Sequence, residues 1–123
     1  MGDKDPDCRR GFPDQSRWDL ETWEHHKKLI ALRHKYPALR TGNYKILFAE
    51  NNVFCFVRQL PNEPNSNSVV IAINSSDAVS QASFYLDSSL LKNQTLVYGE
   101  GSFNYQENNL EVTIPPRQQL ILV

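Results

Sequence analysis

The sequence predicts a mainly β fold, an antiparallel β-sandwich preceded by one long α-helix. From Tyr44 onward, short runs rich in Val, Ile, Phe and Tyr alternate with polar residues at a period of two, and Asn, Ser, Pro and Gly separate the runs. No helical spacing interrupts these runs, so the strands are expected to pair in antiparallel sheets. Apolar residues recur at helical spacing only earlier, between residues 17 and 36.

The chain begins with a polar segment, residues 1 to 16, in which Asp, Gly and Pro are frequent and no hydrophobic period is visible, as is typical of a loop. A helix is expected over residues 17 to 36, with Ser16 or Asp19 as its N-terminal cap. Acidic residues come first and basic residues last, as the helix dipole favours. Pro37 ends the helix, because the residue before a proline is displaced from the α region. The apolar positions of the helix are Leu20, Trp23, Leu29, Ile30, Leu32 and Tyr36.

Seven strands are expected after the helix. Asn51 and Asn52 predict a two-residue hairpin turn after the first of them, because Asn tolerates the positive φ that such turns require. Both faces of the second strand are largely apolar, which predicts a strand covered on both sides. The expected strands span residues 44–49, 53–59, 68–74, 81–86, 95–98, 110–114 and 119–123. The expected core residues are Ile46, Phe54, Phe56, Val70, Ile71, Phe84, Val112, Ile114 and Ile121.

Length and charge exclude several classes of protein. A chain of 123 residues fits one domain and is too short for a complete (β/α)8 barrel, which needs on the order of 250 residues. Thirteen Lys and Arg against 14 Asp and Glu give a net charge of −1, whereas binding to nucleic acid normally requires a basic surface. We therefore expect no nucleic acid partner.

The expected location is the cytoplasm. No run of apolar residues is long enough to span a membrane, and the polar first 20 residues do not resemble a signal peptide, so no membrane partner is expected. Cys8 in a charged loop and Cys55 in an apolar strand could form one bridge, but two cysteines do not make a disulfide framework. A reducing compartment is therefore the preferred setting.

The densest polar cluster lies in the N-terminal loop and contains Asp3, Asp5, Asp7, Arg9 and Arg10. An aspartate and an arginine four residues apart can hydrogen-bond neighbouring sugar hydroxyls, one accepting and the other donating. The alternative is a solvated loop whose exposed ion pairs contribute little. The loop lacks the Gly and Glu positions of an EF-hand, so calcium binding is not expected.

The helix carries the other candidate polar and aromatic residues. His25, His26 and His34 have no acidic or thiol partner at the spacing of a known zinc motif, so we expect no metal site. Trp18 and Trp23 could stack on a sugar ring, but at helical spacing they are better explained as packing anchors. No phosphate-binding loop, catalytic triad or nucleophile elbow is present in the sequence.

Several of these segments together resemble a known family. The loop Asp3-Lys4-Asp5-Pro6-Asp7-Cys8-Arg9-Arg10, a Trp-bearing helix with Lys28-Leu29-Ile30-Ala31-Leu32-Arg33, and the sequence Tyr36-Pro37-Ala38-Leu39-Arg40 with Gly42 are similar to the C-terminal end of the α-amylase family, glycoside hydrolase family 13. The resemblance is to the branch of neopullulanases, cyclomaltodextrinases and maltogenic amylases. It implies that residues 1–41 are the loop and final helix of a truncated (β/α)8 barrel, and that residues 42–123 are domain C, a Greek-key β-sandwich.

The resemblance also implies what the chain does. The three catalytic carboxylates of the family would lie in a barrel upstream of Met1, so the chain is expected to be inactive alone, with no catalytic residue, cofactor or metal. Its role would be that of an accessory domain that stabilises the catalytic barrel of an enzyme acting on starch, maltodextrin, cyclodextrin or pullulan. Asp5 and Arg9 match loop positions that contact glucose in this branch, so the α-glucan substrate of the parent enzyme is an expected ligand.

One alternative stays open, a free-standing carbohydrate-binding or interaction module that uses aromatic residues on a sheet face. The helix favours the accessory domain, because a self-sufficient module has no need of a long apolar helix before its first strand. Separated from a barrel, the helix is expected either to fold back over the sandwich or to pair with the same helix in a homodimer.

Overall fold

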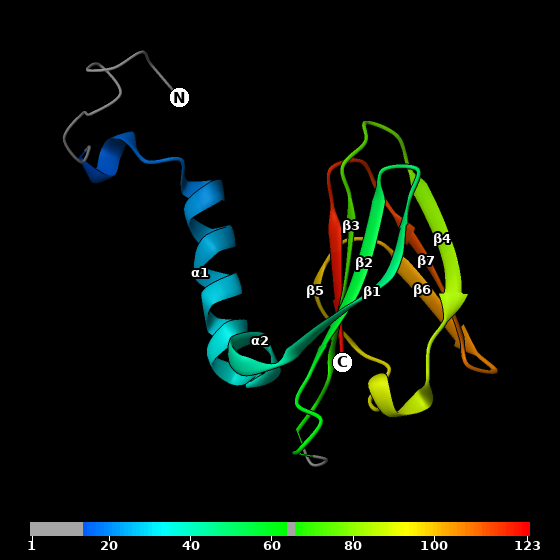
Figure 1. Cartoon of the computed structure of the whole chain (residues 1–123). Helices are drawn as coiled ribbons and strands as arrows, with labels where there is room; N and C mark the ends of the chain where they lie inside the picture. Colours follow the sequence, from blue (N-terminus) through cyan, green and yellow to red (C-terminus); the bar gives the residue numbers. More distant parts are fainter. Residues whose placement is uncertain (1–13, 64–65) are drawn as a thin grey trace, which may run out of the picture. The chain divides into compact units, whose positions relative to one another are not determined.

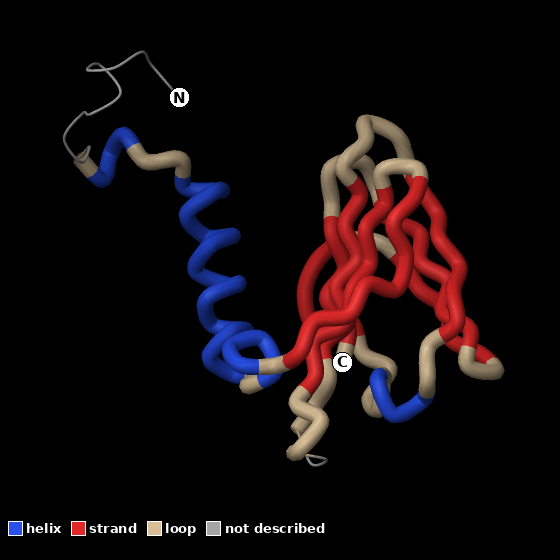
Figure 2. The backbone as a smooth tube through the Cα atoms, in the orientation of Figure 1, coloured by secondary structure: helices blue, strands red, loops and turns tan. Residues whose placement is uncertain are grey.

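The computed structural model describes residues 14–63 and 66–123 of the chain (Figures 1 and 2). The chain divides into two compact units, Met1–Ala31 and Leu32–Val123. The division falls inside the helix α1, Leu20–Lys35, which follows a short 3-10 turn, η1, Gln15–Arg17. The predicted helix is therefore confirmed, with a start three residues later than the sequence indicated.

The first turn of α1 is capped by Asp19. Its carboxylate accepts hydrogen bonds from the backbone N–H of Thr22 at 3.1 Å and from the Thr22 hydroxyl at 2.9 Å. The backbone bond also holds the pKa of Asp19 below its usual value of 3.8, because it stabilises the ionised carboxylate. Of the two caps that the sequence allowed, the structure has Asp19.

The apolar residues of α1 remain at least partly exposed. No residue of the helix is buried, and Leu20, Trp23 and Ile30 are 60%, 39% and 56% exposed. The rings of Trp18 and Trp23 lie 5.8 Å apart at an angle of 47°, and the ammonium group of Lys27 lies 4.8 Å from the centre of the Trp23 ring. Trp23, expected to be a packing anchor, thus contacts Lys27 on its own helix and Trp18 just before that helix.

A sharp corner follows α1 at Pro37. The hydrogen bonds at this corner explain the roles of Pro37 and Arg40 in the sequence Tyr36-Pro37-Ala38-Leu39-Arg40. Pro37 has no N–H, so the carbonyl of Arg33 four residues earlier has no helical partner. A second short helix, α2, Ala38–Thr41, returns Arg40 to this point, where its guanidinium donates to the carbonyl of Arg33 at 2.8 Å and to that of His34. The predicted end of α1 is confirmed, whereas α2 was not predicted.

The corner is also sterically tight. Ala38 is fully buried, and a Cβ atom on Gly42 would lie 2.4 Å from the carbonyl oxygen of Ala38 and 2.8 Å from that of Gln59. Only glycine fits there. The motif from Pro37 to Gly42 therefore positions α2 against the first hairpin of the sandwich, and its function is structural.

In the described part of the chain, eight strands form two antiparallel sheets, which lie face to face in Figure 1. The larger sheet has the order β1-β2-β3-β8-β5, and the smaller sheet has the order β4-β7-β6. The strands of the larger sheet are β1 Asn43–Glu50, β2 Val53–Gln59, β3 Val69–Asn74, β8 Gln119–Leu122 and β5 Leu96–Gly99. Those of the smaller sheet are β4 Ser80–Tyr85, β7 Asn109–Ile114 and β6 Ser102–Gln106, and a 3-10 turn, η2 Ser88–Leu90, follows β4.

The predicted strands are all present, and the antiparallel sandwich is confirmed. Asn51 and Asn52 have φ of 52° and 65° and join β1 to β2, as predicted. The strand β6 was missed, although Phe103 and Tyr105 alternate with polar residues there. The turn after it repeats the Asn51-Asn52 geometry, with φ of 52° at Glu107 and 61° at Asn108.

The core lies between the sheets, and its composition corrects part of the prediction. Of the expected core residues, Val70, Phe84, Val112 and Ile114 belong to the buried cluster between the sheets. Ile121 is also buried, but its pairing with Ile71 places it on the outer side of the larger sheet. Four others point away from the core because the alternate positions of their strands, such as Cys55 and Val57 on β2, occupy its inner side. These four are Ile46, Phe54, Phe56 and Ile71.

Candidate functional site

The residues that the sequence singled out for sugar binding, Asp5 and Arg9, lie outside the described residues. Their role stays a prediction. The candidate site that the structure itself offers is a surface, and it lies on the larger sheet of the sandwich.

The surface is the side of the larger sheet that faces away from the core. The register of the strands aligns Ile46 on β1, Phe56 on β2 and Ile71 on β3 in one cross-strand row, and it pairs Phe54 with Ile73 in the next row. Residues that are directly opposite each other in a ladder share a face of the sheet, so these side chains form one patch. The outer apolar face, as we name it, consists of Tyr44, Ile46, Phe54, Phe56, Ile71 and Ile73.

The side chains of the outer apolar face are only partly covered. Tyr44 and Ile46 are each 54% exposed and Ile73 is 38% exposed, whereas Phe54, Phe56 and Ile71 are half-buried. Burial of a large apolar side chain stabilises a protein by about 1.5–3 kcal/mol relative to full exposure, and much of that gain is unrealised here. A contiguous apolar patch on a folded domain marks a place where another surface binds.

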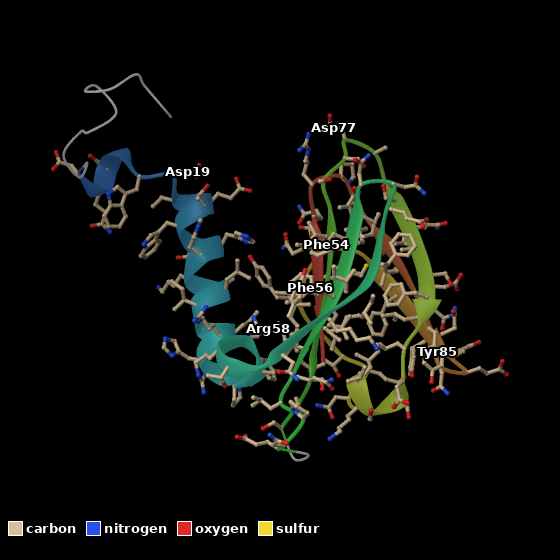
Figure 3. The ribbon with its side chains drawn as sticks, viewed as in Figure 1. Asp19, Phe54, Phe56, Arg58, Asp77 and Tyr85 are labelled. Carbon is tan, nitrogen blue, oxygen red and sulfur yellow. The ribbon has the colours of Figure 1, made fainter. Side chains whose placement is uncertain are left out.

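Aromatic rings hold the middle of this face in a defined arrangement. The ring of Phe56 lies 5.1 Å from that of Tyr44 and 5.3 Å from that of Phe54, at angles of 41° and 35° between the planes. These distances are within the range in which aromatic pairs attract each other. Figure 3 labels Phe54 and Phe56 along β2. These contacts hold the three rings in a defined arrangement.

A β-bulge decides which side chains of β1 belong to the outer apolar face. The register shifts between Ile46 and Phe48, so that Leu47 is the extra residue. Without the shift, Phe48 would follow Ile46 onto the outer side; with it, Phe48 pairs with Cys55 and its ring stacks on Phe84 of the opposite sheet at 6.1 Å. Leu47 thus separates the part of β1 that contributes Ile46 to the outer apolar face from the part that contributes Phe48 to the core.

Arg58 borders the outer apolar face where β2 approaches α2. Its Nη2 donates to the carbonyl of Gly42 at 3.1 Å, which ties the corner to the second strand. Its Nε is buried and has no hydrogen-bond partner in the described residues. The cation therefore supports the local fold at the edge of an otherwise uncharged patch.

Two kinds of chemical centre, a metal cluster and a reactive thiol, can be checked among the described residues. Within residues 14–63 and 66–123, no group of three or more His, Cys, Asp and Glu side chains lies where it could hold a metal ion. Cys55 is a free thiol, and burial raises its pKa from 9.0 to about 12, so it is protonated at neutral pH and a poor nucleophile. Cys8 lies outside the described residues.

The sequence contained a signal for the outer apolar face that was interpreted as core. Because both sides of β2 are apolar, the sequence predicted a strand that is covered by other parts of the protein on both sides. The sandwich buries the inner side chains of β2, Cys55 and Val57, completely. The outer side chains, Phe54 and Phe56, are only half-buried. The outer side of β2 is therefore an apolar surface that the second sheet does not cover.

Comparison with known proteins identifies the relatives of the chain. No protein-family model matches it. It is 33% identical over 116 residues to a cyclomaltodextrinase from Geobacillus thermopakistaniensis, covering 94% of this chain and 19% of that enzyme. It is 26% identical over 134 residues to an amylopullulanase from Thermoanaerobacterium saccharolyticum, covering 99% of this chain and 10% of that enzyme.

Solved structures give the same assignment. The crystal structure of a debranching enzyme from Nostoc punctiforme superposes with a TM-score of 0.80 at 34% identity, over 96% of this chain and 24% of that one. The chain thus spans between a tenth and a quarter of the length of these relatives. It belongs to the α-amylase family, glycoside hydrolase family 13, and corresponds to the C-terminal portion of those enzymes.

Proposed function

We propose that the chain is the C-terminal accessory domain of a glycosidase that acts on α-glucans, and that it stabilises the catalytic barrel of that enzyme without being catalytic itself. The observation that carries the proposal is the outer apolar face. A sandwich that functioned alone would lose stability and solubility by exposing Ile46 beside Phe56, whereas a domain fastened to a larger body needs such a surface.

The relatives support the nature of that larger body. They are a cyclomaltodextrinase, an amylopullulanase and a debranching enzyme, and the chain matches only a small share of each. The helix α1 supports the same proposal, because Leu20 and Ile30 are also exposed within their own unit. We propose that both surfaces are covered by the catalytic barrel, which lies upstream of this chain in the parent enzyme.

The proposal can be tested in a chimera. The region of the Geobacillus cyclomaltodextrinase that aligns with this chain would be replaced by residues 1–123. We expect the chimera to fold and to hydrolyse cyclodextrin, and we expect the isolated chain to release no sugar from any α-glucan. Phe56→Asp and Ile46→Asp should shorten the half-life of the chimera at elevated temperature, because each would place an unpaired charge in the interface.

Val79 provides the matched control for this experiment. It is an apolar residue that is 62% exposed, in the loop before β4 and outside the outer apolar face. Val79→Asp should leave the half-life of the chimera unchanged. Equal half-lives for the parent chimera and its Phe56→Asp variant would contradict the proposed docking.

Two further expectations belong to this proposal. Asp5 and Arg9 would contact glucose in the parent enzyme, so Asp5→Ala or Arg9→Ala should lower its kcat/KM by an amount equivalent to about 1–3 kcal/mol, the scale for losing a charged hydrogen bond. The cytoplasmic location expected from the sequence stays part of this proposal. No described helix is both long and apolar enough to cross a membrane.

A further inference from the structure

Arg58 is a charged side chain that lies in line with the outer apolar face. The register places it in a cross-strand row between Tyr44 on β1 and Val69 on β3. It is two positions along β2 from Phe56, so both side chains belong to the same side of the sheet, and Figure 3 shows them in succession on that strand. Arg58 is half-buried, whereas its neighbour Val69 is fully buried. A cation therefore adjoins a surface that is otherwise apolar.

Arg58 uses little of its hydrogen-bonding capacity within the chain. A guanidinium has several N–H groups, and among the described residues their only acceptor is the carbonyl of Gly42, 3.1 Å from Nη2. The Nε atom is buried from solvent and has no acceptor in that part of the chain. Buried polar atoms nearly always have a partner, so the unpaired Nε indicates that a contact of this side chain is missing from the isolated chain.

No carboxylate of the described residues pairs with Arg58. The sequence has no Asp or Glu from residue 25 to residue 49, a segment that contains six Lys and Arg. Glu50 pairs with Val53 at the other end of β2, about 17 Å from Arg58 by the rise of a strand. Glu63, in the loop after β2, accepts a hydrogen bond from a serine hydroxyl of its own loop. A counter-ion for Arg58 would therefore have to come from outside the described residues.

Covering the outer apolar face would make the lack of a counter-ion costly. A surface that docks on Tyr44 and Phe56 removes water from them and from the neighbouring guanidinium of Arg58. An unpaired charge in a dry interface opposes association strongly. A carboxylate bound in the bidentate manner satisfies both the charge and a pair of N–H groups, whereas a backbone carbonyl satisfies only a hydrogen bond. A carboxylate is thus the acceptor that fits Arg58 best.

We infer that Arg58 forms an ion pair with an Asp or Glu side chain of the catalytic barrel, and that this pair fixes the register of the sandwich on the barrel. The inference rests on the proposed function, because it takes the barrel as the body that covers the outer apolar face. It adds the chemistry of the partner surface, an apolar patch with a carboxylate beside it. The apolar contacts supply affinity, and the bidentate pair, which is directional, supplies specificity.

The test compares the chimera with its Arg58→Gln variant at elevated temperature. We expect Arg58→Gln to shorten the half-life about tenfold, because it leaves the carboxylate of the barrel unpaired in the interface. Arg117→Gln is the matched control. It makes the same change at an ion pair with Asp77 that is exposed to solvent, and since such pairs contribute little, the half-life should be unchanged.

The isolated chain separates this role from a purely structural one. There Arg58→Gln removes only the hydrogen bond to the carbonyl of Gly42. We expect the unfolding rate of the isolated chain, measured by circular dichroism, to rise no more than about threefold. A tenfold rise in the isolated chain would show that Arg58 supports the local fold alone.

A cross-link identifies the partner side chain. A carbodiimide joins an amine to a carboxylate that it contacts, so in the Arg58→Lys variant of the chimera it should link position 58 to an Asp or Glu of the barrel, detected by mass spectrometry. Failure to find such a link, or an unchanged half-life in Arg58→Gln, would overturn the inference. If Phe56→Asp still shortened the half-life, the proposed docking would stand without the ion pair, so the two failures are distinguishable.

Discussion

The two outer sides of the sandwich differ in kind. The larger sheet presents the outer apolar face, in which Ile46 and Phe56 lie among other apolar side chains. The outer side of the smaller sheet is polar, and there Glu111 is bordered by amides and hydroxyls. Both sheets contribute an apolar inner side to the same core. Alternation of apolar and polar residues is therefore complete in the smaller sheet and incomplete in the larger one.

This difference is the reason for proposing that the outer apolar face contacts another surface. An antiparallel sheet with one side in water has polar residues on that side, as the smaller sheet does. A sheet that is apolar on both sides is typical of one covered on both sides, and in this sandwich the second sheet covers only the inner side of β2.

The largest expected effect is the difference in folding between charged substitutions on the two sides of β2. Val57 is fully buried in the core and Phe56, its neighbour, is half-buried on the outer apolar face. Val57→Asp places an unpaired charge in the core, at a cost of several kcal/mol, and should abolish cooperative thermal unfolding measured by circular dichroism. Phe56→Asp should leave the isolated chain folded. A similar loss of folding in both variants would show that the outer side of β2 is part of the core.

The thiol of Cys55 tests the burial of the inner side of β2 through the pH dependence of stability. Its pKa is raised to about 12 by burial, so above pH 9 the unfolded chain loses a proton that the folded chain retains. The free energy of unfolding should therefore decrease as pH rises from about 9 toward 12, by at most about 1.4 kcal/mol per pH unit from this group. Urea unfolding of the chain and of its Cys55→Ala variant isolates the effect. Parallel pH profiles for the two proteins would show that the thiol is accessible.

The outer apolar face should also cause the isolated chain to associate. We expect its apparent size to rise over a hundredfold range of concentration, and Ile46→Lys to raise the concentration required about tenfold, since it removes one apolar contact and adds a charge. Trp23→Lys tests the pairing through the helix that the sequence suggested, and should have the smaller effect. Val79→Lys should have none. A compact monomer of the unmodified chain at every concentration would contradict this expectation.

The sequence predicted the elements well because their signals are local. Pro37 ended the helix, and the Asn51-Asn52 turn joined two strands with the expected geometry. The assignment of side chains to the two sides of the larger sheet was poorer. The bulge at Leu47 reverses the alternation of β1, and nothing local distinguishes an apolar residue under the second sheet from one under a partner.

Two features depended on contacts between distant segments and could not be predicted from local patterns. The strand β6 has only Phe103 and Tyr105 as apolar residues, and it becomes recognisable once it pairs with β7. The polar outer side of the smaller sheet forms only because β4, β7 and β6 align their polar positions in register, and β4 and β7 are separated in the sequence by more than 20 residues. The site predicted from the resemblance, Asp5 and Arg9, lies outside the described residues.

The smallest expected effect lies outside both faces, at the start of α1. The hydrogen bond from the backbone of Thr22 lowers the pKa of Asp19, so the cap stabilises the helix fully above pH 3.8 and is lost as pH falls through the lower folded-state value. Helicity at 222 nm should decrease slightly over that range while the near-ultraviolet signal of the sandwich is unchanged. Asp19→Asn keeps an oxygen that can accept from Thr22 and has no carboxyl to titrate, so its helicity should not change with pH. Identical acid profiles for the two proteins would show that another group controls the end of the helix.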